Sequence, residues 1–117
     1  MQIGVSSYSF SRLVRNGEMA QVDVPAKAAE IGFDAIEFST LAVPDGQALP
    51  DVAATLKEAC ERAGLPVVNY TIGADFLTGS GGDLDAEIER VKEEVRIAAI
   101  LGASGMRHDA SRGFPAG

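Results

Sequence analysis

The sequence is poor in the features that oxidised and membrane-spanning proteins depend on. Its single cysteine, Cys60, cannot form an internal disulfide, which is typical of a reducing compartment. No uncharged apolar stretch approaches the roughly 18–20 residues that a membrane helix needs, and the chain does not open on a basic segment followed by an apolar one. We therefore expect a cytoplasmic protein that does not act on membranes.

Positive charge is also scarce. Ten Lys and Arg residues stand against 17 Asp and Glu residues, which leaves a net charge of −7, and no run of basic residues occurs. Such a field repels phosphate backbones, so nucleic acid binding is not expected. A small anionic ligand is not excluded, because a local cation site can still hold a phosphorylated metabolite.

What is present is an ordinary globular composition. Apolar residues make up 46% of the 117 residues and charged residues 23%, which is enough for one hydrophobic core. Domains commonly have roughly 100–150 residues, so residues 1–117 are expected to form a single domain.

Strand and helix patterns alternate along the chain. Strands are expected within residues 2–7, 34–39, 66–72 and 105–109, and helices within 18–31, 50–63 and 84–101. The buried helix stripes are expected to be Val24, Ala28 and Ile31; Val52, Leu56, Ala59 or Cys60, and Ala63; and Leu84, Ile88, Val91, Val95 and Ala98. Residues 111–117 are expected to be turn-like. The alternation predicts an α/β protein with parallel strands joined by right-handed crossovers.

A hidden repeat supports this interpretation. Gly32, Gly64 and Gly102 each follow a helix and precede a strand by three residues, and each suits the left-handed position after the last helical turn. In this register the apolar face of the strands carries Ile36, Phe38, Val68, Tyr70 and Met106. The opposite face carries Ser6, Glu37, Asn69, Arg107 and Asp109, with Ser39 and Thr71 also polar.

The polar face has the composition of a ligand site, because functional residues of parallel β/α proteins gather at the carboxyl ends of strands. Structural roles stay open for each residue. Glu37 and Arg107 are also consistent with an interstrand ion pair, Asn69 with a loop-supporting amide, and Asp109 with a helix cap. His108 is in the register of the residues that face the helices, so a structural histidine and a metal ligand are both open.

Two further features have simpler interpretations. Cys60 lies beside an apolar stripe and is expected to be a core residue. The Gly79–Gly82 run lacks the Lys-Ser/Thr ending of a phosphate loop and does not directly follow a strand. It is either a flexible loop on the substrate side or a plain linker.

Three segments carry a resemblance to a known family. They are Ile3-Gly4-Val5-Ser6-Ser7-Tyr8-Ser9-Phe10, Gly32-Phe33-Asp34-Ala35-Ile36-Glu37-Phe38 and Leu101-Gly102-Ala103. Together they resemble the xylose-isomerase-like barrel family, which includes sugar phosphate isomerases and epimerases, inosose dehydratases and endonuclease IV-type enzymes. The resemblance extends from Ile3 to about Asp109. It implies the N-terminal half of a (β/α)8 TIM barrel, with about four strands and three helices, ending after the fourth strand.

The resemblance also implies a chemistry. Many members hold a divalent metal (Mn, Mg, Co or Zn) through Glu, Asp and His and move a proton next to a sugar carbonyl. Most of those ligands come from later strands, so no metal ligand is assigned in this chain and its catalytic residues are unknown. Only Glu37 matches a family position that commonly faces the substrate, and members vary widely at the position of Arg107, His108 and Asp109. From their places at the strand ends, we expect Glu37, Asn69, Arg107, His108 and Asp109 to be the residues that bind a sugar or sugar phosphate.

The leading hypothesis is therefore an N-terminal portion of a metal-dependent sugar isomerase or epimerase that is inactive by itself. A second hypothesis is a non-catalytic half-barrel that forms a homo-oligomer through its exposed strand edges. A third, a fragment of an abasic-site nuclease, agrees poorly with the acidic balance and the single histidine.

Overall fold

The computed structural model describes residues 1–114 and contains one four-stranded parallel sheet. The strands are β1 (Gly4–Ser6), β2 (Ala35–Ser39), β3 (Val67–Ile72) and β4 (Met106–His108), and they lie side by side in the order β1-β2-β3-β4. Each neighbouring pair is parallel. The predicted α/β fold with parallel strands is confirmed, and the strands lie inside the predicted ranges.

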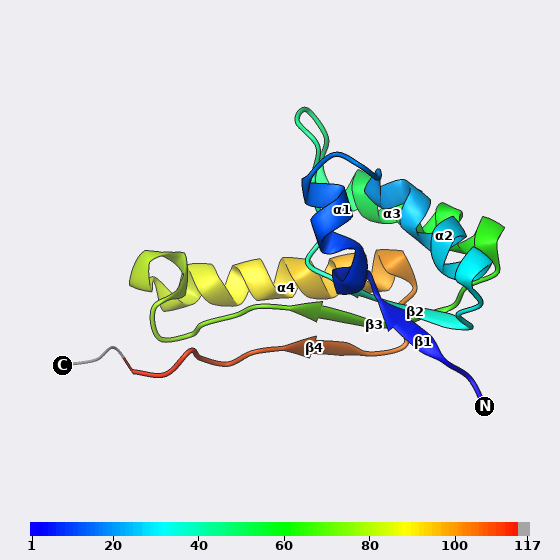
Figure 1. The fold of residues 1–117 in the computed structure, drawn as a ribbon. Coiled ribbons are helices and arrows are strands. Elements are labelled where there is room, and N and C mark those ends of the chain that lie inside the picture. The colour runs from blue at the N-terminus through cyan, green and yellow to red at the C-terminus, as the bar shows by residue number, and fades with distance from the viewer. Residues whose placement is uncertain (115–117) are drawn as a thin grey trace.

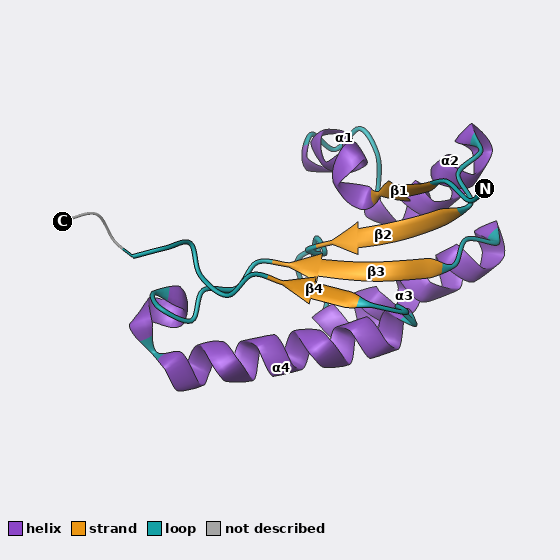
Figure 2. Ribbon diagram, turned by 90° about the horizontal axis from the view of Figure 1, so that it is seen from below, coloured by secondary structure: helices purple, strands orange, loops and turns teal. Residues whose placement is uncertain are grey.

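Three helices make the crossovers between successive strands: α2 (Val24–Ile31), α3 (Leu49–Ala63) and α4 (Leu84–Leu101). All three lie on one side of the sheet (Figure 1). Viewed from below, the other face of the sheet is uncovered and the strand ends point toward the same edge (Figure 2). Among residues 1–114, no helix has the length and apolar character needed to cross a membrane.

The glycine-anchored repeat is confirmed at each helix end. Gly32, Gly64 and Gly102 have φ values of 111°, 69° and 72°, in the left-handed region that a side chain would strain. The residue after each glycine donates its backbone N–H to a carbonyl five residues earlier, as in Phe33 to Ala28. Each β/α unit therefore turns from helix to strand by the same hydrogen-bonded motif.

The core lies between the sheet and the helices. Ile36, Phe38 and Tyr70 are fully buried on the helix-facing side of the sheet, as predicted. Cys60 is also buried, and desolvation raises the pKa of its thiol to about 11, so it is a core residue. Asp83 caps α4 by accepting a hydrogen bond from the Ala86 backbone N–H.

The position of Val68 in the core is the first prediction that the structure contradicts. A register shift between Ile36 and Glu37 pairs Ile36 with Val67, so Val67 is buried and Val68 is 42% exposed. A single extra residue turns one side chain to the opposite face of a strand. Met106 is partly buried against the core, in agreement with its predicted face.

The fourth strand is shifted relative to the predicted repeat. Arg107 was expected beside Asn69, but it pairs with Thr71, two residues further along β3. The place beside Asn69 is taken by Gly105, where a Cβ would lie 3.1 Å from the Asn69 Oδ1 atom. The absence of a side chain at Gly105 leaves room for this amide, so the shifted register accommodates it.

The helix stripes are correct in α3 and partly wrong in α2 and α4. Ile31, Leu84 and Val95 are exposed, whereas the buried residues of α4 include Glu87 and Ile97. The apolar residues on α4 lie on two sides of the helix, and only packing selects the buried side.

A short helical segment between β1 and α2 was not predicted. A 3-10 turn (Ser7–Phe10) and α1 (Ser11–Arg15) follow β1 directly. Phe10 is buried, and Leu13 and Val14 pack against the core. Their spacing of three and four residues is a helical signal that the sequence does contain. The turn-like tail predicted for residues 111–117 lies partly outside the described residues, which end at Phe114.

Candidate functional site

The candidate site is a row of four polar side chains on the uncovered face of the sheet, which we call the polar ladder: Ser6, Glu37, Asn69 and Thr71. Strand pairing brings them together, because Ser6 is the partner of Glu37 and Glu37 is the partner of Asn69. All four were predicted on this face. All four are half-buried.

Hydrogen bonds join the polar ladder from strand to strand. The Ser6 hydroxyl donates to Glu37 Oε1 at 3.3 Å, and Asn69 Nδ2 donates to Glu37 Oε2 at 3.2 Å. Asn69 Nδ2 also donates to the Thr71 Oγ1 atom at 2.9 Å. Each Glu37 oxygen therefore has one protein donor and keeps further lone pairs for a ligand.

The side-chain oxygen of Asn69, Oδ1, faces the neighbouring strand β4. Since both bonds to protein side chains use Nδ2, the Oδ1 atom is directed toward Gly105. An amide oxygen and a carboxylate at neighbouring positions form a surface rich in hydrogen-bond acceptors. Such a surface suits a ligand that offers several hydroxyl donors.

Arg107 and Asp109 lie apart from these bonds and pair with each other. Arg107 Nη2 is 3.0 Å from Asp109 Oδ1, and both side chains are largely exposed. Within the described residues, Arg107 makes no ion pair with Glu37, so that structural alternative does not hold. Asn69 bonds to side chains of the polar ladder, which differs from the loop-supporting role considered for it.

His108 is on the other side of β4. It pairs with the buried Ile72, two residues beyond the position predicted for it, and its ring packs edge-on against Phe76 with centroids 5.9 Å apart. Its Nδ1 atom lies 2.8 Å from the Asp109 backbone oxygen. The structure therefore places His108 away from the polar ladder.

No metal-binding cluster is found in the described part of the chain. Residues 1–114 contain no group of three or more His, Cys, Asp and Glu side chains arranged to hold a metal ion. The polar ladder offers one carboxylate beside an amide and two hydroxyls. These donors do not amount to the Glu, Asp and His set that the resemblance implies, so the polar ladder by itself does not fit a metal ion.

A second polar cluster, which sequence reasoning missed, anchors the loop after β3. Glu87, whose side chain is 3% exposed, receives hydrogen bonds from Arg90, from the Ser80 hydroxyl and from the Asp75 backbone N–H. The Arg90 guanidinium is the main cause that lowers the pKa of Glu87 to about 2. The three-residue spacing of Glu87 and Arg90 was the available signal.

This anchor defines the role of the Gly79–Gly82 run. The segment forms a 3-10 turn with Ser80 at φ 52°, and a Cβ at Gly79 would lie 2.6 Å from the Glu87 Cδ atom. Asp75 accepts bonds from the Leu77 and Thr78 backbones. The segment is therefore a fixed turn packed against α4.

Replacing Glu87 by glutamine should make the free energy of unfolding less dependent on pH between pH 7 and pH 2. A carboxylate whose folded-state pKa lies below its ordinary value of 4.5 stabilises the fold above about pH 4.5, and this contribution is lost as the pH falls toward about 2. We expect E87Q to be less stable than the original chain at pH 7 and the difference to shrink at pH 2–3. Urea unfolding across this range measures it. An equal difference at every pH would contradict the assignment.

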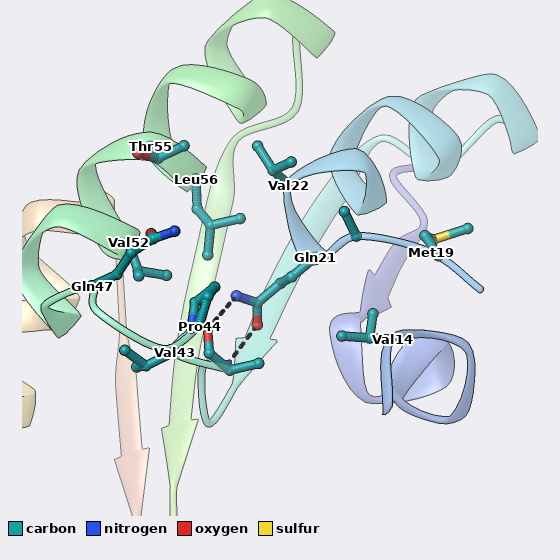
Figure 3. Close-up of a pocket in the computed structure, with 12 residues that line it drawn as sticks. Val14, Met19, Gln21, Val22, Val43, Pro44, Gln47, Val52, Thr55 and Leu56 are labelled. Carbon is teal, nitrogen blue, oxygen red and sulfur yellow. Dashed lines mark hydrogen bonds between the residues drawn. The ribbon is translucent and has the colours of Figure 1, made fainter. Parts of the chain in front are cut away.

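An apolar groove of about 480 Å³ lies between α1, α3 and the segment before α2. Figure 3 shows Gln21 between the two walls, with hydrogen bonds to the Ala42 backbone of 3.1 and 2.9 Å. Val14, Val43, Val52 and Leu56 contribute apolar walls, and no lining residue is charged. The groove has no group for acid–base chemistry, so the polar ladder remains the candidate site.

The fold and the site together define a class of protein. A doubly wound sheet reverses its strand order and carries helices on both faces, whereas here the order is sequential and the crossover helices cover one face. This is the arrangement of one half of a β/α barrel, with the polar ladder on the face that lines the barrel interior.

Comparison with known families is consistent with this class. The sequence model of the xylose isomerase-like TIM barrel matches residues 25–116. The chain belongs to the xylose isomerase-like TIM barrel family. A comparison with curated proteins finds no match.

Proposed function

We propose that this chain forms the substrate-binding wall of a sugar isomerase or epimerase, in which a proton moves next to a sugar carbonyl. The observation that carries the proposal is the polar ladder. It places a carboxylate, an amide and two hydroxyls in one hydrogen-bonded row on the face that lines the interior of a barrel.

Sugar recognition suits this arrangement chemically. A sugar presents several hydroxyls, each of which both donates and accepts hydrogen bonds. Glu37 accepts from such donors through lone pairs that Ser6 and Asn69 leave free, while Ser6 and Asn69 hold the carboxylate in position. Arg107 and Asp109, at the end of β4, extend the same edge and are proposed to contact the sugar further out.

The catalytic step itself is assigned to groups beyond residues 1–114. Family members polarise the carbonyl with a divalent metal, and we propose that its ligands come from further β/α units. By this proposal residues 1–117 bind sugar without turning it over. Aldose–ketose conversion by this chain alone, with Mn²⁺ or Mg²⁺ added, would contradict it.

The binding proposal is tested by titrating the isotope-labelled chain with D-fructose in an NMR experiment. We expect saturable shifts of the Asn69 side-chain amide and of the Glu37 backbone amide. Shifts that are absent or confined to the helix-covered side would contradict the proposal.

The open edges of the sheet favour a second candidate, self-association. Within the described residues, the outer edge of β1 and that of β4 have no strand partner. A second copy is able to add β4 to β1 in parallel on both sides and close a barrel. A discrete dimer in light scattering supports this candidate, whereas a monomer contradicts it.

A further inference from the structure

The outer face of α4 carries a row of apolar side chains, which we call the apolar stripe: Leu84, Ile88, Val95 and Ala99. Leu84 and Val95 are 50% and 51% exposed, Ile88 is half-buried and Ala99 is exposed. Their spacing places them along one line of the helix, separate from the buried line that includes Glu87. Helix α4 therefore buries a carboxylate and presents apolar side chains to solvent.

The apolar stripe lies at the end of the row of crossover helices. Helix α4 leads from β3 to β4, which is an edge strand of the described sheet, and α3 packs against α4. Figure 2 shows α4 along the β4 side of the molecule. Within residues 1–114, no further crossover helix follows α4 to cover this face.

A row of charged side chains runs beside the apolar stripe, and we call it the charged row: Asp85, Glu89, Lys92 and Arg96. All four are exposed, and their spacing places them along one line of α4. The two acidic residues come first and the two basic residues follow. Asp85 makes no ion pair with any residue that the structure describes, whereas Glu89 pairs with Lys92 at 2.8 Å.

This order of charges is complementary to itself when the helix is reversed. If a second α4 packs antiparallel to the first, Asp85 comes opposite Arg96 of the second copy, and Glu89 comes opposite Lys92 of the second copy. A parallel pair would place like charges together. Around the two-fold axis, the Glu89 and Lys92 side chains of both copies then alternate in sign, as in an ion-pair network.

The same two-fold arrangement covers the apolar stripe. It brings Leu84 and Ile88 of one copy toward Ala99 and Val95 of the other, so the exposed apolar side chains cover each other. An apolar centre with a polar rim of complementary charge is the usual construction of a protein interface.

We propose that the outer face of α4 is a docking surface for a second copy of this chain, with the two α4 helices packed antiparallel. This contact uses a helix face and no strand edge, so it differs from the strand-edge association described above. It also leaves the polar ladder free, because α4 lies on the other side of the sheet.

Sedimentation equilibrium of the whole chain at increasing concentration tests the proposal. We expect a monomer–dimer equilibrium with a dissociation constant on the order of 100 μM, since two helices about 27 Å long make a smaller contact than a standard interface. Added salt should weaken the dimer, because exposed ion pairs are screened.

Charge reversal identifies the surface and its orientation. Asp85→Lys with Glu89→Lys makes the charged row wholly basic, and Lys92→Glu with Arg96→Glu makes it wholly acidic. Each double variant alone should dimerise about tenfold or more weakly, whereas an equimolar mixture of the two should form a heterodimer at least as tight as the original dimer.

The matched control is Glu58→Lys with Glu61→Lys, which makes the same change of charge at exposed positions of α3 and should leave dimerisation unchanged. Circular dichroism verifies that every variant folds. Three results would overturn the proposal. A monomer up to about 1 mM would leave the apolar stripe to a helix of a further β/α unit. Dimerisation that survives both reversals would place the contact at the strand edges, and a mixture that stays monomeric would exclude the antiparallel pairing.

Discussion

Replacing Glu37 by glutamine is expected to weaken the binding of D-fructose by roughly tenfold to a hundredfold. Hydrogen bonds to a charged group contribute about 1.5–3 kcal/mol, which corresponds to that range of affinity. Glutamine has the same shape but one acceptor oxygen in place of two. Ser6 and Asn69 both donate to the carboxylate, so the amide also loses one of these two bonds.

A matched control removes the same charge from the other side of the molecule. Glu58 is exposed on α3, which covers the helix side of the sheet, so Glu58→Gln should leave fructose affinity unchanged. Circular dichroism verifies that both variants fold. If the two variants bind fructose equally well, Glu37 is not a ligand-binding residue and the polar ladder has a structural role only.

Replacing Phe38 by alanine is expected to remove a large part of the stability of the fold. Phe38 is fully buried in β2, a central strand of the sheet. A cavity left by a buried phenylalanine costs about 3–5 kcal/mol, against a total of roughly 5–15 kcal/mol for a domain. Urea unfolding should show a midpoint lowered accordingly, or a chain already unfolded at room temperature.

Val68→Ala is the informative comparison, because the repeat placed Val68 in the same core and the structure places it on the exposed face. Replacing the exposed Val68 side chain by that of alanine should change the free energy of unfolding by less than about 1 kcal/mol. A cost comparable to that of Phe38→Ala would restore the predicted register and contradict the shift between Ile36 and Glu37.

The parts of the fold that were predicted correctly depend on local chemistry. A helix that ends at Gly32, Gly64 or Gly102 requires a left-handed residue there, and glycine adopts that conformation without strain. The strand that follows comes from β-branched and aromatic residues over a few positions. These signals lie within about ten residues of each other, so a single sequence contains them.

The errors have a different origin, because they involve contacts between separate elements of the fold. Val68 faces outward because the pairing of β2 with β3 shifts register between Ile36 and Glu37. Arg107 pairs with Thr71, two residues beyond the predicted partner, because Gly105 leaves room for the Asn69 side chain. Glu87 is buried because Arg90, Ser80 and the Asp75 backbone satisfy its carboxylate. Apart from the three-residue spacing of Glu87 and Arg90, none of these pairings is encoded by periodicity.

By itself, the sequence determined the parallel β/α architecture, the turn at each helix end, and the strand face that carries Glu37 and Asn69. Short-range preferences decide these features. Only the tertiary structure decided which polar residues touch: it joined Ser6, Glu37, Asn69 and Thr71, left Arg107 paired with Asp109, and turned His108 toward Phe76. The reason is that strand register, set by packing across the whole sheet, brings together side chains more than 30 residues apart in the sequence.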